Sequence, residues 1–222
     1  SYESVPCKKC EYCLNVKASK MSKRVKQEIL EHEFSVMFTL TYDNDHIPTM
    51  EVFQDRNGKI QLRAIGRTEM SGKSSPYNNK GITHYGYEFE DDLFIPTIEN
   101  KKLSSSDNFQ FGYVCKKDIQ DFMKRLRDKI YKLNIPKHEK EIRYFIASEY
   151  GPKTMRPHYH GTLFFDSKEI ASKIKAFITE SWGKKYKTGR KFNDYAFVPF
   201  CDPFFTAKYV KFCDPNTAYY VA

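Results

Sequence analysis

The chain has 222 residues, 40% of them hydrophobic and 29% charged, which predicts a folded, soluble protein whose core needs no disulfide scaffold. Its 37 Lys and Arg outnumber 28 Asp and Glu, and the net charge of +9 favours a polyanionic partner, although a basic protein without such a partner has the same balance. No run of about 18 apolar residues is present, and the first residues lack the apolar core of a signal peptide, so the sequence excludes a membrane-spanning helix and argues against secretion.

Three cysteines lie close together at the start of the chain. Cys7, Cys10 and Cys13 have the two-residue spacing of metal ligands, and a structural zinc ion is one interpretation of them. The neighbouring sequence offers no fourth ligand, so a more distant cysteine or a histidine would have to complete the site. A group of thiols without a metal is the alternative.

A helix, a strand and an insertion follow. Residues 14–33 are rich in Lys, Glu, Gln and Ala and lack Gly and Pro, which predicts a helix. Residues 34–42 are β-branched and aromatic, which predicts a buried strand. Between residues 50 and 112, hairpin-like pieces at 59–65 and 85–89 alternate with Gly, Ser and Asn clusters. We interpret this region as an insertion with loops rather than as a second domain.

The clearest predicted helix covers residues 117–133, where apolar side chains recur every three or four positions. Two strands follow at 143–150 and 158–165, and the short linker between them predicts antiparallel neighbours. Asp166 and Glu169 then resemble a capping box at the start of another helix.

The C-terminal part begins with a strongly basic stretch at 183–191, which we expect to be a loop, and a strand at 195–200. Asp202 and Asp214 each precede a proline, a pattern typical of helix N-termini. The helix expected after Asp214 carries Tyr220. Because the sequence ends there without a helix cap, we expect the chain to be part of a longer protein.

Two histidines alternate along the strand at 158–165. Alternate residues of a strand share a face, so His158 and His160 point the same way, where two imidazoles can bind one ion. Glu149 ends the preceding strand and places a carboxylate near the same edge. This donor set leaves coordination positions open and suits Mn²⁺ or Mg²⁺ acting as a Lewis acid. Hydrogen-bonded surface histidines and an ordinary charged strand end are the alternative.

With these motifs, the chain resembles the replication initiators of the HUH endonuclease superfamily, in which two histidines flank a bulky residue. It is most similar to those of gokushovirus-like microviruses, which are single-stranded DNA phages. The stretches that carry the resemblance are residues 38–42, 149–160 and, as the start of a third motif, 220–222. The N-terminal cysteines fit as well, whereas the insertion at 50–112 contributes little.

The resemblance implies a tyrosine nucleophile on a helix that faces the metal. Tyr220 begins the family's third motif, Tyr-Val-Ala-Lys-Tyr, of which this sequence holds the first three residues. Tyr209 is the rival, because residues 207–210 resemble the later half of that motif. The implied reaction nicks single-stranded DNA at a replication origin, leaves a 5′-phosphotyrosine and a free 3′-hydroxyl for rolling-circle replication, and can religate. The implied setting is the host bacterial cytoplasm, with host helicase and polymerase as candidate partners.

Basic side chains near the site and in the stretch at 183–191 are the candidate DNA contacts. Tyr42 and Tyr150, beside the same motifs, could stack on splayed bases. The basic candidates are Lys153, Arg156, Lys184, Lys185, Lys187, Arg190 and Lys191.

The predicted order of elements favours an α+β fold, with helices packed on a central antiparallel sheet, as in the ferredoxin- or RRM-like HUH endonuclease fold with a large insertion. We expect one domain over residues 1–222, with a cysteine-rich start and first helix at 1–33. That fold also carries plain binding modules, so a non-catalytic module for single-stranded nucleic acid is the main alternative function. A zinc-stabilised interaction domain and a metal-dependent hydrolase that uses water are further alternatives.

Overall fold

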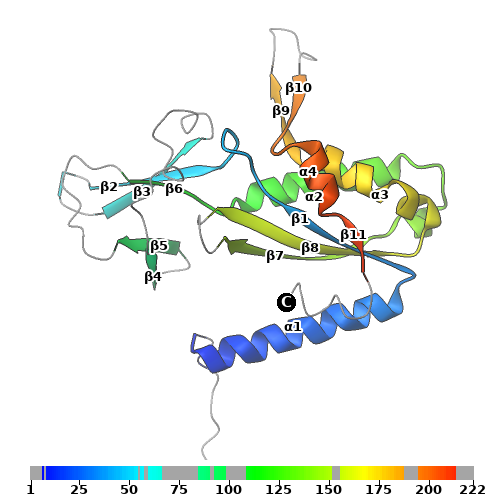
Figure 1. The fold of residues 1–222 in the computed structure, drawn as a ribbon, viewed down its shortest axis with the longest axis horizontal. Helices are drawn as coiled ribbons and strands as arrows, with labels where there is room; N and C mark the ends of the chain where they lie inside the picture. Colours follow the sequence, from blue (N-terminus) through cyan, green and yellow to red (C-terminus); the bar gives the residue numbers. More distant parts are fainter. Residues whose placement is uncertain are drawn as a thin grey trace, which may run out of the picture. The chain divides into compact units, whose positions relative to one another are not determined.

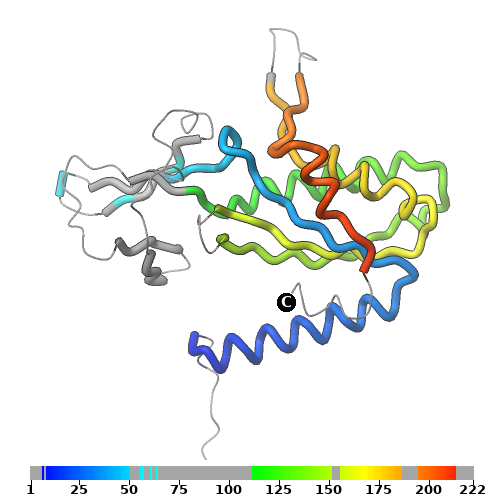
Figure 2. Tube along the Cα trace, in the orientation of Figure 1, coloured from blue at the N-terminus to red at the C-terminus, as the bar shows by residue number. Residues whose placement is uncertain are grey.

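The chain forms two compact units in the computed structural model. The sheet unit comprises Ser1–Thr41, Cys115–Glu149 and His158–Ala222, and the insertion unit comprises Tyr42–Val114 and Tyr150–Pro157. The assignment of all 222 residues to a single domain stays a prediction. Figure 2 traces the chain. The residues that the structure describes are 7, 9–54, 56–57, 60–66, 85–90, 93–98, 109–151, 156–187 and 195–213.

The sheet unit is built on a four-stranded sheet with the strand order β11-β1-β8-β7 (Figure 1). The three long strands are β1 (Phe34–Leu40), β7 (Arg143–Tyr150) and β8 (Pro157–Phe165), and they confirm the strands predicted from the sequence. β1 runs antiparallel to β8 and to the short edge strand β11 (Lys211–Phe212). The fold is therefore α+β with an antiparallel sheet, as predicted.

Four α-helices are described in this unit. They are α1 (Glu11–Glu31), α2 (Lys116–Tyr131), α3 (Lys168–Ser181) and α4 (Pro203–Lys208), and a short 3-10 helix, η3, spans Lys137–Lys140. The first three confirm the predicted helices, although α1 begins three residues earlier than expected. None of the described helices is long and apolar enough to cross a membrane.

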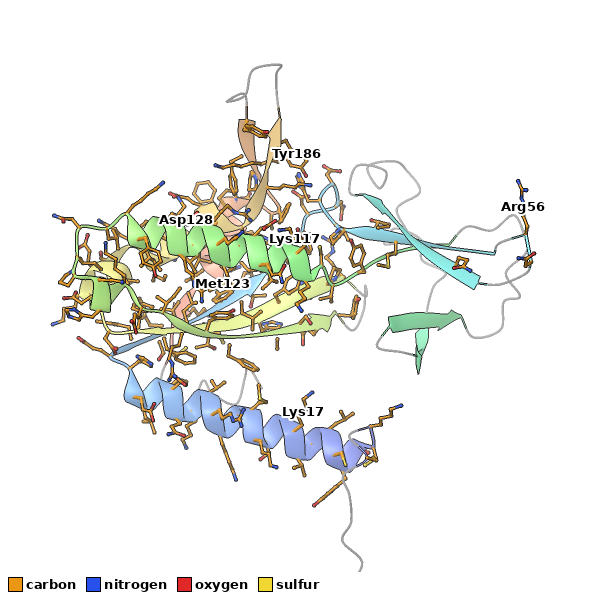
Figure 3. The ribbon with its side chains drawn as sticks, turned by 180° about the vertical axis from the view of Figure 1, so that it is seen from behind. Lys17, Arg56, Lys117, Met123, Asp128 and Tyr186 are labelled. Carbon is orange, nitrogen blue, oxygen red and sulfur yellow. The ribbon has the colours of Figure 1, made fainter. Side chains whose placement is uncertain are left out.

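One face of the sheet packs against α2 and α3 to form the main core. The ring of Phe38 on β1 lies 5.6 Å from that of Phe122 on α2, and Trp182, just after α3, contacts Phe122 and Tyr159 edge-on. All four side chains are at most 1% exposed. Figure 3 shows Met123, also buried, between α2 and the sheet. The odd-numbered residues of β8 therefore face this core, because side chains alternate along a strand.

The opposite face of the sheet packs against α1 at one end. Val25 of α1 contacts Phe164 of β8 in a small apolar cluster that also includes Ile29 and Phe145. Glu28 of α1 adds an ion pair of 2.8 Å with Arg143 on β7. In Figure 1, α1 lies across the sheet from α2 and α3. The even-numbered residues of β8 thus face α1 or the surface beside it.

The start of α3 differs from the predicted capping box. Ser167 is the N-cap residue, and its side chain makes no capping hydrogen bond. The carboxylate of Asp166 instead accepts a hydrogen bond of 2.8 Å from the backbone N–H of Glu33 and lies 3.1 Å from Nδ1 of His32. The prediction was wrong because a long-range partner, the end of α1, takes this carboxylate. At α4 the prediction is confirmed, since Asp202 accepts from the N–H of Phe204.

The basic stretch predicted as a loop begins with a strand. β9 (Gly183–Lys187) pairs antiparallel with β10 (Tyr195–Pro199), so the loop prediction was wrong for its first five residues. Arg125 of α2 holds the base of this hairpin by donating to the carbonyl oxygens of Ser181 and Gly183, at 2.9 and 2.6 Å. A side chain at Gly183 would collide with the backbone of β10, because its Cβ would lie 2.4 Å from the Val198 carbonyl oxygen.

The insertion unit contains two small antiparallel sheets. β2 pairs with both β3 and β6, and β4 pairs with β5. β3 and β4 confirm the hairpin-like pieces predicted at 59–65 and 85–89. The strands are β2 (Thr49–Gln54), β3 (Ile60–Gly66), β4 (Tyr85–Glu90), β5 (Leu93–Ile98) and β6 (Phe109–Gly112).

Candidate active site

The candidate site lies on the face of the sheet opposite α2 and α3. His158 and His160 are both half-buried on β8 and share this face with Phe164. Glu149 on the neighbouring strand β7 reaches the same place, and its Oε1 lies 2.7 Å from Nε2 of His160. The structure therefore brings together one histidine and the carboxylate that the sequence predicted as partners.

Two threonines of β1 hold the histidine rings. The strand register pairs Thr39 with His160, and the Thr39 hydroxyl lies 3.1 Å from Nδ1 of His160. Thr41, two residues further along β1, lies 2.9 Å from Nδ1 of His158. A histidine that donates its Nδ1–H to a neighbour presents the lone pair of Nε2 to an ion. Sequence reasoning missed both threonines, although their alternation within the stretch at 38–42 was the available signal.

The core side of β8 fixes the strand that carries the histidines. The Tyr159 hydroxyl accepts a hydrogen bond of 2.7 Å from the backbone N–H of Cys115, the residue before α2, and its ring packs against Trp182. At Gly161 a Cβ atom would lie 2.1 Å from the ring of Phe38, so the ring needs the glycine in order to lie flat on the strand. Both contacts leave β8 little freedom to shift.

The donor set fits a divalent ion in its chemistry, with two imidazoles anchored at Nδ1 and one carboxylate. The donor atoms of Glu149, His158 and His160 are not all within 4.8 Å of one another, a condition that one cysteine cluster meets among the described residues. An ion with ligand distances of about 2.0–2.2 Å would replace the hydrogen bond between His160 and Glu149. The Glu149 side chain is 56% exposed, so it has room to rotate toward such an ion.

The two candidate nucleophiles differ in what the structure says of them. Tyr220 and the helix predicted to carry it lie outside the described residues. Tyr209 follows α4, and its ring packs 4.9 Å from that of Phe205. Because α4 packs against α3, Tyr209 lies with the helices of the core face rather than with the histidines.

The predicted DNA contacts are partly described. Lys184 and Lys185 are exposed on β9, where Lys187 ends the strand. Arg156 donates from its guanidinium to the Tyr42 carbonyl oxygen, at 2.9 Å, and to the Asn44 side chain, so it ties residues of its own unit together. The remaining candidates lie outside the described residues, namely Lys153, Arg190 and Lys191.

The two aromatic residues proposed for base stacking are engaged elsewhere. Tyr42 is 1% exposed, so the prediction that it stacks on DNA bases was wrong. The Tyr150 hydroxyl accepts a hydrogen bond from the N–H of Val114, and burial raises the pKa of Tyr150. Sequence alone did not separate these core tyrosines from exposed ones.

The N-terminal cysteines form the second cluster of candidate ligands. The sulfur atoms of Cys7, Cys10 and Cys13 all lie within 4.8 Å of one another, so together they could bind a metal such as zinc. Backbone hydrogen bonds from Cys10 and Lys9 lower the pKa of Cys7 to about 6. Among the described residues, no more distant cysteine or histidine joins the group, contrary to the expectation of a fourth ligand from elsewhere in the chain.

Comparisons with known proteins agree with the predicted resemblance. Residues 103–210 match a family model for replication-associated proteins of the ORF2 type, and this match includes β7 and β8 with all three candidate ligands. "Replication-associated protein VP4" of Bdellovibrio phage phiMH2K is 29% identical over 97 residues, which are 44% of this chain and 29% of the phage protein. The match thus covers less than a third of that relative's length. No solved structure matches the chain. Both sequence matches confirm that the chain is related to phage replication-associated proteins.

Proposed function

We propose that this Rep-like protein initiates rolling-circle replication as a metal-dependent endonuclease that nicks single-stranded or locally melted DNA at an origin. One observation carries the proposal: two histidines anchored at Nδ1 by threonines share a sheet face with Glu149, which lies 2.7 Å from His160. A module that only binds nucleic acid needs no such set of ligands.

The order of elements supports an HUH endonuclease fold. β1, α2, β7, β8, α3 and β11 follow one another in the β-α-β-β-α-β order of ferredoxin-like folds, and the sheet order is β11-β1-β8-β7. In this assignment α1 precedes the fold, and the insertion unit interrupts it between β1 and α2. The histidines then lie on a central strand of the sheet, on the face away from α2 and α3.

Glu149, His158 and His160 are the residues that would hold the ion, with Mn²⁺ or Mg²⁺ as the candidates. Such an ion, when bound, acts as a Lewis acid on the scissile phosphate. Thr39 and Thr41 orient the two imidazoles through Nδ1, so each ring presents Nε2. The side chains on the core face of β8 keep the two rings at a fixed spacing.

Tyr220 is the proposed nucleophile. Its phenolic oxygen forms a bond to the scissile phosphorus while the bond from phosphorus to the 3′ oxygen breaks, and the phenol proton is released as the 3′ oxygen gains one. A phenol with a pKa near 10 is a weak nucleophile at neutral pH, so the reaction depends on stabilisation of charge at the phosphate. The products are a 5′-phosphotyrosine and a free 3′-hydroxyl. Attack by that hydroxyl on the phosphotyrosine reverses the step and religates the DNA.

The proposed setting follows from the products. A host polymerase would extend the 3′-hydroxyl, and a host helicase would open the duplex ahead of it. The protein would therefore act in the cytoplasm of the phage's bacterial host.

The test is a search for a covalent adduct. The protein is mixed with Mn²⁺ and end-labelled single-stranded fragments of its own phage genome, and the products are separated on a denaturing gel. We expect label to migrate with the protein, to require the divalent ion, and to disappear in Tyr220→Phe. Tyr195→Phe is the matched control, because Tyr195 is an exposed tyrosine on β10. Loss of the adduct in Tyr209→Phe instead would keep the mechanism and move the nucleophile.

A non-catalytic module for single-stranded nucleic acid is the second candidate. The observation that favours it is the hairpin of β9 and β10, which exposes Lys184 and Lys185 together with the rings of Tyr195 and Phe197. Figure 3 labels Tyr186 on the same hairpin. Lysines and aromatic rings on one element suit a strand whose backbone is charged and whose bases stack. Salt-sensitive DNA binding without an adduct, in a protein that includes the complete third motif, would favour this module.

A further inference from the structure

We propose that Cys7, Cys10 and Cys13 bind one Zn²⁺ ion through three thiolates, with a water molecule as the fourth ligand, and that this ion fixes the first turn of α1. The site is separate from the histidine site in its place in the fold and in its donor atoms. It does not depend on the proposed nicking activity.

The spacing of the sulfur atoms carries the proposal. In a tetrahedral zinc site with Zn–S bonds of about 2.3 Å, neighbouring sulfurs lie about 3.8 Å apart. The sulfurs of Cys7 and Cys13 are 3.8 Å apart, and all three sulfurs are within 4.8 Å of one another. Small side-chain rotations are therefore sufficient to bring the three thiolates around one ion.

The start of α1 is arranged to support thiolates. Cys10 is the N-cap residue, and its side chain makes no capping hydrogen bond to the helix. Its backbone N–H lies 3.3 Å from the sulfur of Cys7, in position to donate to it, while its carbonyl oxygen accepts from the N–H of Leu14. Donors to sulfur and the positive end of a helix dipole both favour the deprotonated thiol, which is the form that binds metal.

The identity of the ion and of its fourth ligand follows from the donors. Thiolates are soft ligands that select zinc over the hard ions Mg²⁺ and Mn²⁺. Among the described residues, no other Cys, His, Asp or Glu joins the group. Cys7 and Cys10 are exposed, so water can reach an ion held between them. Three protein ligands and a water complete a tetrahedral zinc site.

The proposed role of the ion is to anchor residues 7–13 to one another. On its own, this stretch has little packing, because Val25 is the one fully buried side chain described in α1. Bound zinc adds covalent-strength links across the first turn, and we expect slower hydrogen exchange there than in the metal-free chain. The sheet, which is held by its own core, should show no such difference.

The experiment titrates Co²⁺ into the full, reduced, metal-free chain. We expect one equivalent to produce the near-ultraviolet charge-transfer band of thiolate ligands together with the visible bands of a four-coordinate ion, and Zn²⁺ to displace it. Bound Zn²⁺ should also protect three of the six cysteines from a thiol reagent. In Cys10→Ser we expect the affinity to fall by on the order of 100-fold or more, since even a change beside a metal ligand costs about 10–100-fold.

Cys213→Ser is the matched control, because Cys213 lies outside the cluster and should leave the titration unchanged. Circular dichroism of both variants checks that the chain still folds. Equal cobalt binding by Cys10→Ser, protection of a fourth thiol, or a disulfide within the cluster of the protein isolated from cells would each overturn the proposal.

Discussion

The two faces of strand β8 make opposite use of neighbouring residues. Tyr159, Gly161 and Leu163 face the core formed with α2 and α3, where packing leaves almost no surface exposed. His158 and His160 face the other way, are half-buried, and are held by hydrogen bonds to side chains of neighbouring strands. The core face determines where the strand lies, whereas the site face determines what the strand can bind. Substitutions on the two faces should therefore have separable effects on stability and on chemistry.

The largest effect on stability is expected for Trp182→Ala. Trp182 is fully buried, packs against Phe122, Tyr159 and Phe200, and donates a hydrogen bond from Nε1 to the Thr41 carbonyl oxygen. Removing a buried aromatic ring costs about 3–5 kcal/mol. Urea unfolding followed by circular dichroism measures the loss. A change below about 1 kcal/mol would contradict the packing of this core.

Gly161→Ala should cost somewhat less. The added Cβ would meet the ring of Phe38, which is 0% exposed and packs against Phe122, so the ring has no open space to enter. Overpacking of this kind costs about 1–3 kcal/mol. The same unfolding measurement applies, with Ala147→Gly on the neighbouring strand as a comparison for a change of one methyl group. Unchanged stability in Gly161→Ala would contradict the close approach of the ring.

Thr39→Val tests the site face. The substitution keeps the shape of the side chain but removes the hydroxyl that lies 3.1 Å from Nδ1 of His160. A lost partner beside a metal ligand lowers metal affinity by about 10–100-fold. Calorimetric titration with Mn²⁺ measures the change, and Thr179→Val on α3 is the matched control, because its hydroxyl bonds only within its helix at Lys175. Equal Mn²⁺ affinity in Thr39→Val and the control would contradict the positioning role.

The smallest expected effect concerns the link between α1 and the end of β8. A hydrogen bond from the N–H of Glu33, assisted by His32, lowers the pKa of Asp166 below its ordinary 3.8. A carboxylate with a lowered pKa stabilises the fold above its unfolded-state pKa and loses that contribution as pH falls through the folded-state value. Asp166→Asn should therefore cost less than about 1 kcal/mol at neutral pH, since the pair is largely exposed, and nothing well below pH 3.8. Urea unfolding across that pH range would show the difference vanish, and a constant difference would contradict the assignment.

The elements with strong periodicity could be predicted from the sequence, and those set by distant partners could not. α2 and the strands β1, β7 and β8 have clear apolar patterns, and the alternation of His158 and His160 placed them on one face. β9 was missed because Lys184 and Lys185 resemble a solvated loop, while its partner β10 lies beyond residue 194. The Asp166 capping prediction failed because the competing donor, Glu33, is 133 positions away along the chain. The roles of Thr39 and Thr41 depend on the register of β1 with β8, which single-sequence patterns do not reveal.

The decisive comparison on β8 is the Mn²⁺-dependent yield of protein–DNA adduct in His160→Gln and in its neighbour Tyr159→Phe. His160 faces the site, and its substitution should lower the yield by about 10²–10³-fold while leaving stability nearly unchanged. Tyr159 faces the core, and loss of its hydroxyl, which bonds the N–H of Cys115, should cost about 1–2 kcal/mol of stability and leave adduct formation largely intact. Wild-type yield in His160→Gln, or loss of the adduct in a folded Tyr159→Phe protein, would contradict the assignment of chemistry to the site face.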